Sequence, residues 1–385
     1  MIEEFGWSRS AISAVFFLNT TIYAISLIAV GRLYDRHGPK WVLILSTVLL
    51  AAGFALTSMI NDYWQFLIGY GILAAAGLGG TSVPLIAALM SKWFERWRGL
   101  AISLALSGNS VGQFVLIPLF SITVVEHGWR PSYLAIALIM LGVNIVLATW
   151  VIKGDPHDLG HTPFGQRPQG VPSGTARSIA AGGGSTDLGL MQAMRTRSFW
   201  LFNVVMFICG SGDFLTATHL IPLVTDHGLS PTTGGQMLAW YGLLSFLGML
   251  VAGPASDLLG NKLPIALTFV LRILLFLLIV LYQTPLALYV FALVFGFTYL
   301  ITAPLTPTLI GRLYGLSHVG ILSGFITTIH HLGGGFWTYL GGWIFDETGS
   351  YHWIFVMSAA TALVAVVCTL LIAERRHEAI KPGLR

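Results

Sequence analysis

Long apolar stretches alternate with short polar segments along this chain of 385 residues. The stretches reach or exceed the ~20 residues that an α-helix needs to cross a lipid bilayer. They cover residues 10–30, 41–60, 64–90, 97–125, 131–152, 198–225, 231–252, 263–282, 285–310, 317–342 and 352–373. Because a helix satisfies its backbone hydrogen bonds within one segment, this pattern predicts an all-α membrane protein with eleven spans.

Composition supports this fold class and narrows the function. Hydrophobic residues make up 55% and charged residues 9% of the chain, against about 25% charged residues in soluble domains. The net charge of +4 gives no reason to propose a nucleic-acid partner. Cys209 and Cys368 stand in no Cys-x-x-Cys or Cys/His cluster, so neither a disulfide framework nor a zinc site is expected. The sequence has no phosphate-binding loop, so ATP-driven pumping has no support. We expect a protein that is not an enzyme and that needs no cofactor.

A polar ten-residue turn between two apolar stretches occurs twice. The first copy runs from Gly31 to Lys40 and the second from Gly253 to Lys262, an offset of 222 residues. The copies share Gly31 with Gly253, Asp35 with Asp257 and Gly38 with Gly260, and Arg36 follows the aspartate in the first copy. Glycine permits tight turns and close helix approach. A period of this length indicates two homologous halves rather than a solenoid.

The register of the repeat makes eleven spans an unexpected number. Residues 4–8 match residues 226–230 at the same offset, but a complete span precedes only the second copy. We therefore expect that a first helix is missing from this chain; the alternative is a genuine eleven-helix protein. The predicted organisation is an N-terminal bundle at 1–152 (helices 2–6), a Gly/Pro-rich cytoplasmic linker at 153–197, a C-terminal bundle at 198–373 (helices 7–12) and a cytoplasmic tail at 374–385.

The basic residues set the orientation. If the Gly31 turn is cytoplasmic, 17 of the 20 lysines and arginines fall on the inside, as the positive-inside rule requires. The exceptions are Arg9 and Arg130, which fall outside, and Arg272, which falls within a span.

Ionisable residues within spans are costly and indicate functional sites. Arg272 lies ten residues beyond Lys262, near the bilayer centre. Its planar guanidinium can donate hydrogen bonds to both oxygens of a carboxylate. We weigh two roles for Arg272: binding an anionic substrate, or a structural ion pair with Asp213, the acidic residue deep in a span. Burial favours the neutral form of a carboxyl, so Asp213 is a candidate proton carrier. The histidines His219, His330 and His331 are further candidates for proton coupling or for hydrogen bonds to a substrate.

Uncharged polar residues near mid-membrane complete the candidate site. Asn19 and Tyr23 share a helix face, as do Asn109 and Gln113, because each pair is spaced i, i+4. Tyr241 and Tyr299 are also central. Such residues can line a substrate cavity, or they can simply form hydrogen bonds between helices. The glycines of Gly77-Leu-Gly-Gly80 and Gly108-x-x-x-Gly112 predict close helix contacts.

The duplicated turn resembles the cytoplasmic signature turn of the major facilitator superfamily. Further stretches resemble its bacterial monocarboxylate-transporter-like branch. In the second half they are Thr218-His-Leu-Ile-Pro222, Leu271-Arg272, His330-His-Leu-Gly-Gly-Gly335 and Gly341-Gly-Trp-Ile-Phe-Asp-Glu-Thr-Gly-Ser-Tyr351, and in the first half Phe5-Gly-Trp-Ser-Arg9 and Trp93-Phe-Glu-Arg-Trp-Arg-Gly99. The resemblance implies two pseudo-symmetric six-helix bundles in a monomeric, multi-pass protein of the bacterial inner membrane, which moves monocarboxylates together with protons or exchanges organic anions. Two features depart from the branch. The first-helix signature is not in this chain, and the aspartate and arginine of the eighth helix have no match between Tyr241 and Gly253.

The sequence thus predicts an alternating-access secondary transporter whose partners are a small organic anion, protons and the lipid bilayer. The anion is expected near Arg272, Asn109, Tyr241, Tyr299 and His331, with Asn19, Tyr23 and Gln113 lining the cavity and Asp213 or a histidine taking the proton. The alternatives are a proton antiporter that exports hydrophobic compounds and a membrane receptor of the same fold.

Overall fold

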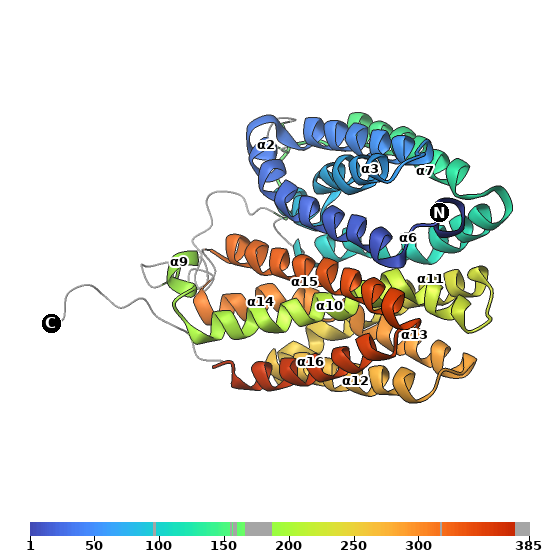
Figure 1. Cartoon of the computed structure of the whole chain (residues 1–385). Helices are drawn as coiled ribbons and strands as arrows, with labels where there is room; N and C mark the ends of the chain where they lie inside the picture. Colours follow the sequence, from blue (N-terminus) through green and yellow to red (C-terminus); the bar gives the residue numbers. More distant parts are fainter. Residues whose placement is uncertain (95–97, 155, 157–159, 166–186, 316–317, 374–385) are drawn as a thin grey trace, which may run out of the picture.

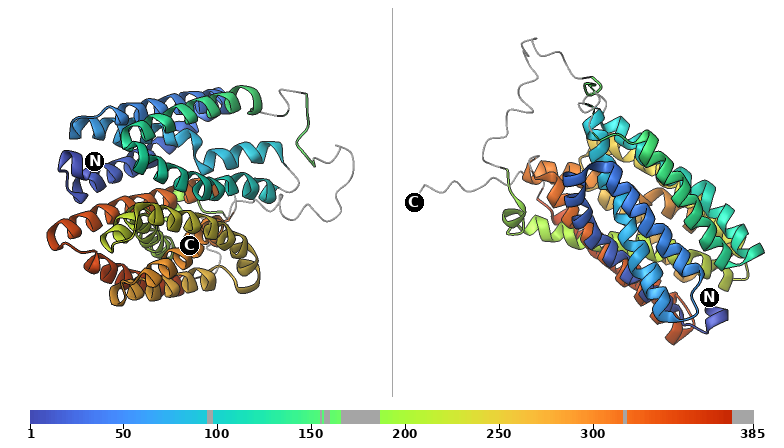
Figure 2. Two further views of the ribbon diagram at one scale, coloured as in Figure 1. Left: turned by 90° about the vertical axis from the view of Figure 1, so that its right-hand side faces the viewer. Right: turned by 90° about the horizontal axis from the view of Figure 1, so that it is seen from above.

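The computed structural model describes residues 1–385 except 95–97, 155, 157–159, 166–186, 316–317 and 374–385. Its regular elements are helices, arranged as two bundles that lie side by side (Figures 1 and 2). The N-terminal bundle contains α1 (Ile2–Phe5), α2 (Arg9–Ser58), α3 (Tyr63–Phe66), η1 (Leu67–Ala74), α4 (Ala75–Leu78), η2 (Gly79–Thr81), α5 (Val83–Trp93), α6 (Arg98–His127), α7 (Trp129–Val146) and η3 (Leu147–Val151). The C-terminal bundle contains α9 (Leu190–Ala193), α10 (Arg197–Asp226), α11 (Pro231–Leu259), α12 (Lys262–Leu281), α13 (Pro285–Tyr299), α14 (Thr302–Tyr314), α15 (Val319–Thr348) and α16 (His352–Leu371).

Helices occupy most of each of the eleven predicted spans. By length and composition, nine helical segments of the described chain can cross a membrane. The other two predicted spans, residues 64–90 and 317–342, are also helical but are not among these nine segments. Residues 64–90 pass through α3, η1, α4, η2 and α5, with changes of helical type between them, and α15 is one continuous helix of 30 residues. The predicted tail and most of the Gly/Pro-rich linker lie outside the described residues.

The duplicated turn has the same backbone shape in both bundles. Gly38 has φ 75° and ψ 172°, and Gly260 has φ 76° and ψ 176°. This left-handed region is favourable for glycine because it has no Cβ. Side-chain contacts of Asp35 and Asp257 are not described, and Arg36 is exposed. Close approach at the first glycine of each turn is not seen, since a Cβ on Gly31 or Gly253 would meet no atom within 4 Å.

Glycines elsewhere show where helices do touch closely. A Cβ on Gly77 would overlap the backbone of Leu50, and one on Gly80 would overlap Ser46, as the Gly77–Gly80 motif predicts. The prediction for Gly108 and Gly112 is wrong for this conformation, because both have open space around them. Their neighbour Ser110 instead makes the contact of α6, with its hydroxyl 3.2 Å from that of Ser245 on α11.

The two bundles meet along α2 and α15 as well as along α6 and α11. On α15, a Cβ at Gly335 would overlap Thr20 of α2, and one at Gly342 would lie 2.7 Å from the hydroxyl of Ser13. Gly324 falls on the same face by its spacing of seven residues from His331. It has open space around it. The bundles are therefore in contact from the middle of α15 to its predicted outer end.

Helix α10 is the central helix of the C-terminal bundle. In its most apolar window 67% of residues are buried, against 6% for α6 and 11% for α7. A continuous core of Phe, Leu and Ile side chains surrounds α10. A polar side chain in the middle of α10 must therefore find its partners within the protein.

Candidate functional site

A buried ion pair lies at the centre of the C-terminal bundle. Nη2 of Arg272 on α12 is 2.6 Å from Oδ1 of Asp213 on α10, and both side chains are at most 2% exposed. The guanidinium also donates from Nε to the hydroxyl of Thr298 (3.2 Å) and from Nη2 to its carbonyl (3.1 Å). A third donor, Nη1, lies 3.3 Å from the carbonyl of Cys209. Of the two roles weighed for Arg272, the ion pair with Asp213 is the contact that the structure contains.

The second oxygen of Asp213 faces α15. Nε2 of His330 lies 3.1 Å from Oδ2 of Asp213, and the thiol of Cys209 donates to the same oxygen at 3.4 Å. Gly210 makes this approach possible, because a Cβ at that position would overlap the carbonyl of His330. Asp213 thus joins a permanently charged arginine to a titratable histidine on another helix.

His331 continues the site to the boundary between the bundles. Its Nδ1 is 2.8 Å from the carbonyl of Thr327. Its ring centroid lies 5.0 Å from that of Tyr23 on α2. Phe214 packs against both histidines, with centroids 5.7 Å from His330 and 5.3 Å from His331. The two adjacent histidines therefore have different surroundings: His330 contacts the buried carboxylate, and His331 contacts the other bundle.

Two tyrosines line the side of the ion pair nearest α11 and α13. The rings of Tyr241 and Tyr299 lie 4.9 Å apart. Tyr241 stacks on Phe295, and the guanidinium carbon of Arg272 lies 4.7 Å from the centroid of that ring. The hydroxyl of Tyr241 is buried and has no hydrogen-bond partner among the described residues.

Other predicted residues lie away from this cluster. Asn19 donates to the carbonyl of Tyr70 at 2.6 Å, within its own bundle, and Asn109 is exposed. Gln113 sits against Gly242 on α11, and its Oε1 is buried without a partner in the described part of the chain. His219 bonds to the hydroxyl of Tyr351 and to the carbonyl of Thr338 near the predicted outer end. The expected cavity lining is thus divided between several places.

The sequence reasoning missed three contributors. Cys209 lies four residues before Asp213 on the same helix face, and that spacing could have identified it. Thr298 precedes Tyr299 and forms two of the hydrogen bonds to Arg272. Phe214 follows Asp213, and nothing in the sequence distinguished it from the other apolar residues of its span.

Cys209, Asp213 and His330 also offer a possible set of metal ligands. One donor atom from each lies within 4.8 Å of the other two, and thiolate, carboxylate and imidazole are all ligands of transition metals. However, Arg272 already neutralises the carboxylate at 2.6 Å, and its charge opposes a divalent cation at such a short distance. The geometry favours an ion pair with a protonatable neighbour over a metal centre.

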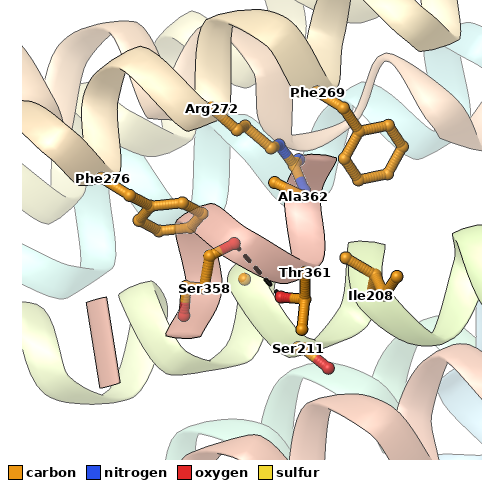
Figure 3. A pocket seen from close by; sticks show the side chains of 9 residues that line it. Ile208, Ser211, Phe269, Arg272, Phe276, Ser358, Thr361 and Ala362 are labelled. Carbon is orange, nitrogen blue, oxygen red and sulfur yellow. Dashed lines mark hydrogen bonds between the residues drawn. The ribbon is translucent and has the colours of Figure 1, made fainter. Parts of the chain in front are cut away.

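The packing behind Arg272 leaves no room for a substrate. A cavity of about 10 Å³ lies there, and its lining includes Arg272, Ser211, Ser358 and Thr361 (Figure 3). A cavity of this size holds at most a single water molecule. His330, His331 and Tyr23 lie on the opposite side of Asp213, toward the boundary between the bundles.

Comparison with known proteins identifies the family. A model of the Major Facilitator Superfamily matches residues 1–336 and, in a second match, 202–384. The chain belongs to the major facilitator superfamily. It is therefore a multi-pass membrane transporter of the secondary type and not an enzyme. The overlapping matches agree with the repeat seen in the two turns.

The chain is similar in sequence to two curated relatives and in fold to two solved structures. The chain is 27% identical to the uncharacterized MFS-type transporter YcxA of Bacillus subtilis, over 91% of this chain and 83% of the relative. It is 27% identical to monocarboxylate transporter 11 of Homo sapiens, over 86% and 68%. The fold matches the E. coli fucose:proton symporter FucP with a TM-score of 0.61, at 17% identity and over 94% and 92% of the chains. It also matches a bacterial homologue of the human lysosomal transporter Spinster in an inward-facing and occupied conformation, with a TM-score of 0.70, at 12% identity and over 96% and 90%.

Proposed function

We propose that this transporter moves a small organic anion together with a proton, and that the proton binds at the Asp213–His330 contact. The observation that carries the proposal is the shared carboxylate: Asp213 contacts Arg272 through one oxygen and His330 through the other. Relatives named as monocarboxylate transporters support the substrate class.

The net charge of the buried cluster of Asp213, Arg272 and His330 explains how binding of a proton and binding of an anion are coupled. With a neutral His330, the charges of Asp213 and Arg272 cancel and the buried cluster has no net charge. One proton on His330 or Asp213 gives the cluster a net charge of +1. In a site of low dielectric this charge attracts an anion strongly. Each ligand therefore raises the affinity for the other, because coupling between two binding events is reciprocal.

The residues then take distinct roles in this proposal. Arg272 is the fixed counter-charge rather than the ligand predicted from sequence, because its donors already contact Asp213, Thr298 and Cys209. The anion binds at the boundary between the bundles, where His331 and Tyr23 meet, with Tyr299 and Tyr241 as further hydroxyl donors. Asn109, Asn19, Gln113 and His219 have no direct role in the binding of the anion.

Transport in proteoliposomes tests the proposal. The purified full chain is reconstituted with an imposed pH gradient, and uptake of radiolabelled lactate and of a labelled dicarboxylate is measured. Asp213→Asn and His330→Gln should abolish uptake driven by the gradient while retaining counterflow exchange. His127→Gln changes an exposed histidine and serves as the matched control, which should transport normally. Unchanged gradient-driven uptake in both site variants would refute the proton role.

A second candidate function is a proton antiporter that exports a hydrophobic compound. The structural ion pair of Arg272 favours this alternative, since an antiporter needs a protonatable Asp213 but no free cation for its substrate. The same vesicles distinguish the symporter from the antiporter. An acidic exterior drives a symported anion into the vesicles together with protons, whereas it drives an antiported compound out of them. Accumulation of a hydrophobic dye with no anion uptake would select the antiporter.

A further inference from the structure

Arg9 at the start of α2 contacts residues of the other bundle through both terminal nitrogens of its guanidinium and through its backbone amide. Its guanidinium forms a two-pronged ion pair with Asp226 at the end of α10, with distances of 2.6 and 2.7 Å. Nη1 also donates to the hydroxyl of Tyr351 at 2.7 Å. The guanidinium carbon lies 3.6 Å from the centroid of the Phe345 ring on α15. Paired geometry of this kind is the strong form of an arginine–carboxylate contact.

The backbone of α2 is held by the same bundle. The amides of Arg9 and Ser10 donate to the two carboxylate oxygens of Asp346 on α15, at 2.9 and 2.7 Å. The first amides of a helix have no partners within the helix, and the positive end of the helix dipole favours a negative charge there. The first turn of α2 is therefore completed by a side chain from the opposite half of the protein.

Comparison of the two repeats shows that this arrangement is asymmetric. In the N-terminal bundle, Glu4 pairs with Arg130 at 2.8 Å, so this acid and base belong to one bundle. Asp226 is the counterpart of Glu4 at the offset of 222 residues. The counterpart of Arg130 at an offset of 221 is Tyr351, which has no charge. The cation that Asp226 lacks within its own repeat is provided across the boundary by Arg9.

We infer that Arg9, through Asp226 and Asp346, is a positioning residue of the transport cycle that holds the two bundles together on the predicted outer face. These contacts must separate whenever the site opens outward. The ion pair is partly accessible, with Arg9 18% and Asp226 28% exposed, so water can solvate both charges as they separate. Gly324, toward the opposite end of the α2–α15 boundary, has open space around it instead. The inference does not depend on the identity of the substrate.

An accessibility measurement tests it. Ser13, 2% exposed and one turn below Arg9, is changed to cysteine, and its reaction with a membrane-impermeant maleimide is followed in right-side-out vesicles of the full-length protein. The same chain without Ser13→Cys measures the labelling of Cys209 and Cys368, which is subtracted. Arg9→Ala and, separately, Asp226→Asn should each raise the labelling rate by about fivefold or more, the range expected for loss of a typical coupling between two states. Arg9→Lys should restore part of the protection.

Arg130→Ala and Glu4→Gln are the matched controls, because they remove an outer-face ion pair that lies within one bundle. Neither should change labelling of Ser13→Cys. Equal labelling in the parent, Arg9→Ala and Asp226→Asn would overturn the inference, as would equal increases in the controls. Asp226→Asn keeps Arg9 in place, so it carries the test if Arg9→Ala fails to reach the membrane. Anion uptake is not part of the readout, so failure of the proposed substrate class would be recognised separately.

Discussion

His330 on α15 reaches the carboxylate of Asp213 on α10, 117 residues away in the sequence, at 3.1 Å. The contact depends on a close crossing of the two helices at Gly210, which lies one turn before Asp213. The Asp213–His330 contact, the packing of α10 on α15 and the boundary with α2 therefore lie within a few residues of α15.

Gly210→Ala should disrupt this crossing. The added methyl group would overlap the carbonyl of His330, so α10 and α15 must move apart and lengthen the Asp213–His330 contact. We expect a lower midpoint of thermal unfolding in detergent and loss of gradient-driven uptake. Gly142→Ala on α7 is the control, since its Cβ would meet no atom within 4 Å. A stable, fully active Gly210→Ala protein would contradict the crossing described above.

Arg272→Ala should destabilise the protein through the partner that it leaves behind. Removing one member of a buried ion pair typically costs ~3–5 kcal/mol, because the remaining charge is buried and unpaired. Thermal unfolding should show that the double variant Arg272→Ala with Asp213→Ala is more stable than Arg272→Ala alone. If the two variants unfold at the same temperature, the main function of Arg272 is not to neutralise Asp213.

Tyr23→Phe and Asn19→Ala should separate the two residues that sequence spacing placed on one helix face. Tyr23 faces His331 across the boundary, so loss of its hydroxyl should raise the apparent KM for anion uptake while protein stability is retained. Asn19 bonds to Tyr70 within the N-terminal bundle, so Asn19→Ala should lower stability more than it changes KM. If Asn19→Ala instead raises KM while Tyr23→Phe mainly lowers stability, Asn19 rather than Tyr23 belongs to the substrate site.

The Glu4–Arg130 pair should depend on pH in a defined direction. Hydrogen bonds from Arg130 and Trp129 lower the pKa of Glu4 below its ordinary value of 4.5. A lowered native pKa means that the pair stabilises the folded state above pH 4.5 and ceases to do so as the pH falls through the native pKa. The difference in Tm between wild type and Glu4→Gln should be largest near neutral pH and disappear in acid. A difference that persists at the lowest pH would indicate that the carboxylate charge is not responsible.

The sequence predicted the fold better than it predicted the site. The length of the apolar stretches located the helices, and the offset of 222 residues placed Gly38 and Gly260 in equivalent turns. Both signals can be read directly from the order of residues, without knowing how the helices pack. Asp213, Arg272 and His330 were found because ionisable residues are rare within spans. Their grouping was not predictable in full, since it depends on how each helix is rotated about its axis. The same limit explains why Asn19 faces Tyr70 and why Ser110 rather than Asn109 reaches α11.

The glycine-rich face of α15 has a mechanical consequence. Gly333 lies against the backbone of Phe207 on α10, while Gly335 and Gly342 lie against α2. One helix thus contacts both halves of the protein at positions that carry no side chain. Glycine positions have no side chain to interdigitate with the neighbouring helix. We therefore expect the N-terminal bundle to rotate against the C-terminal bundle along α15, while the contact between Asp213 and His330 within the C-terminal bundle is kept.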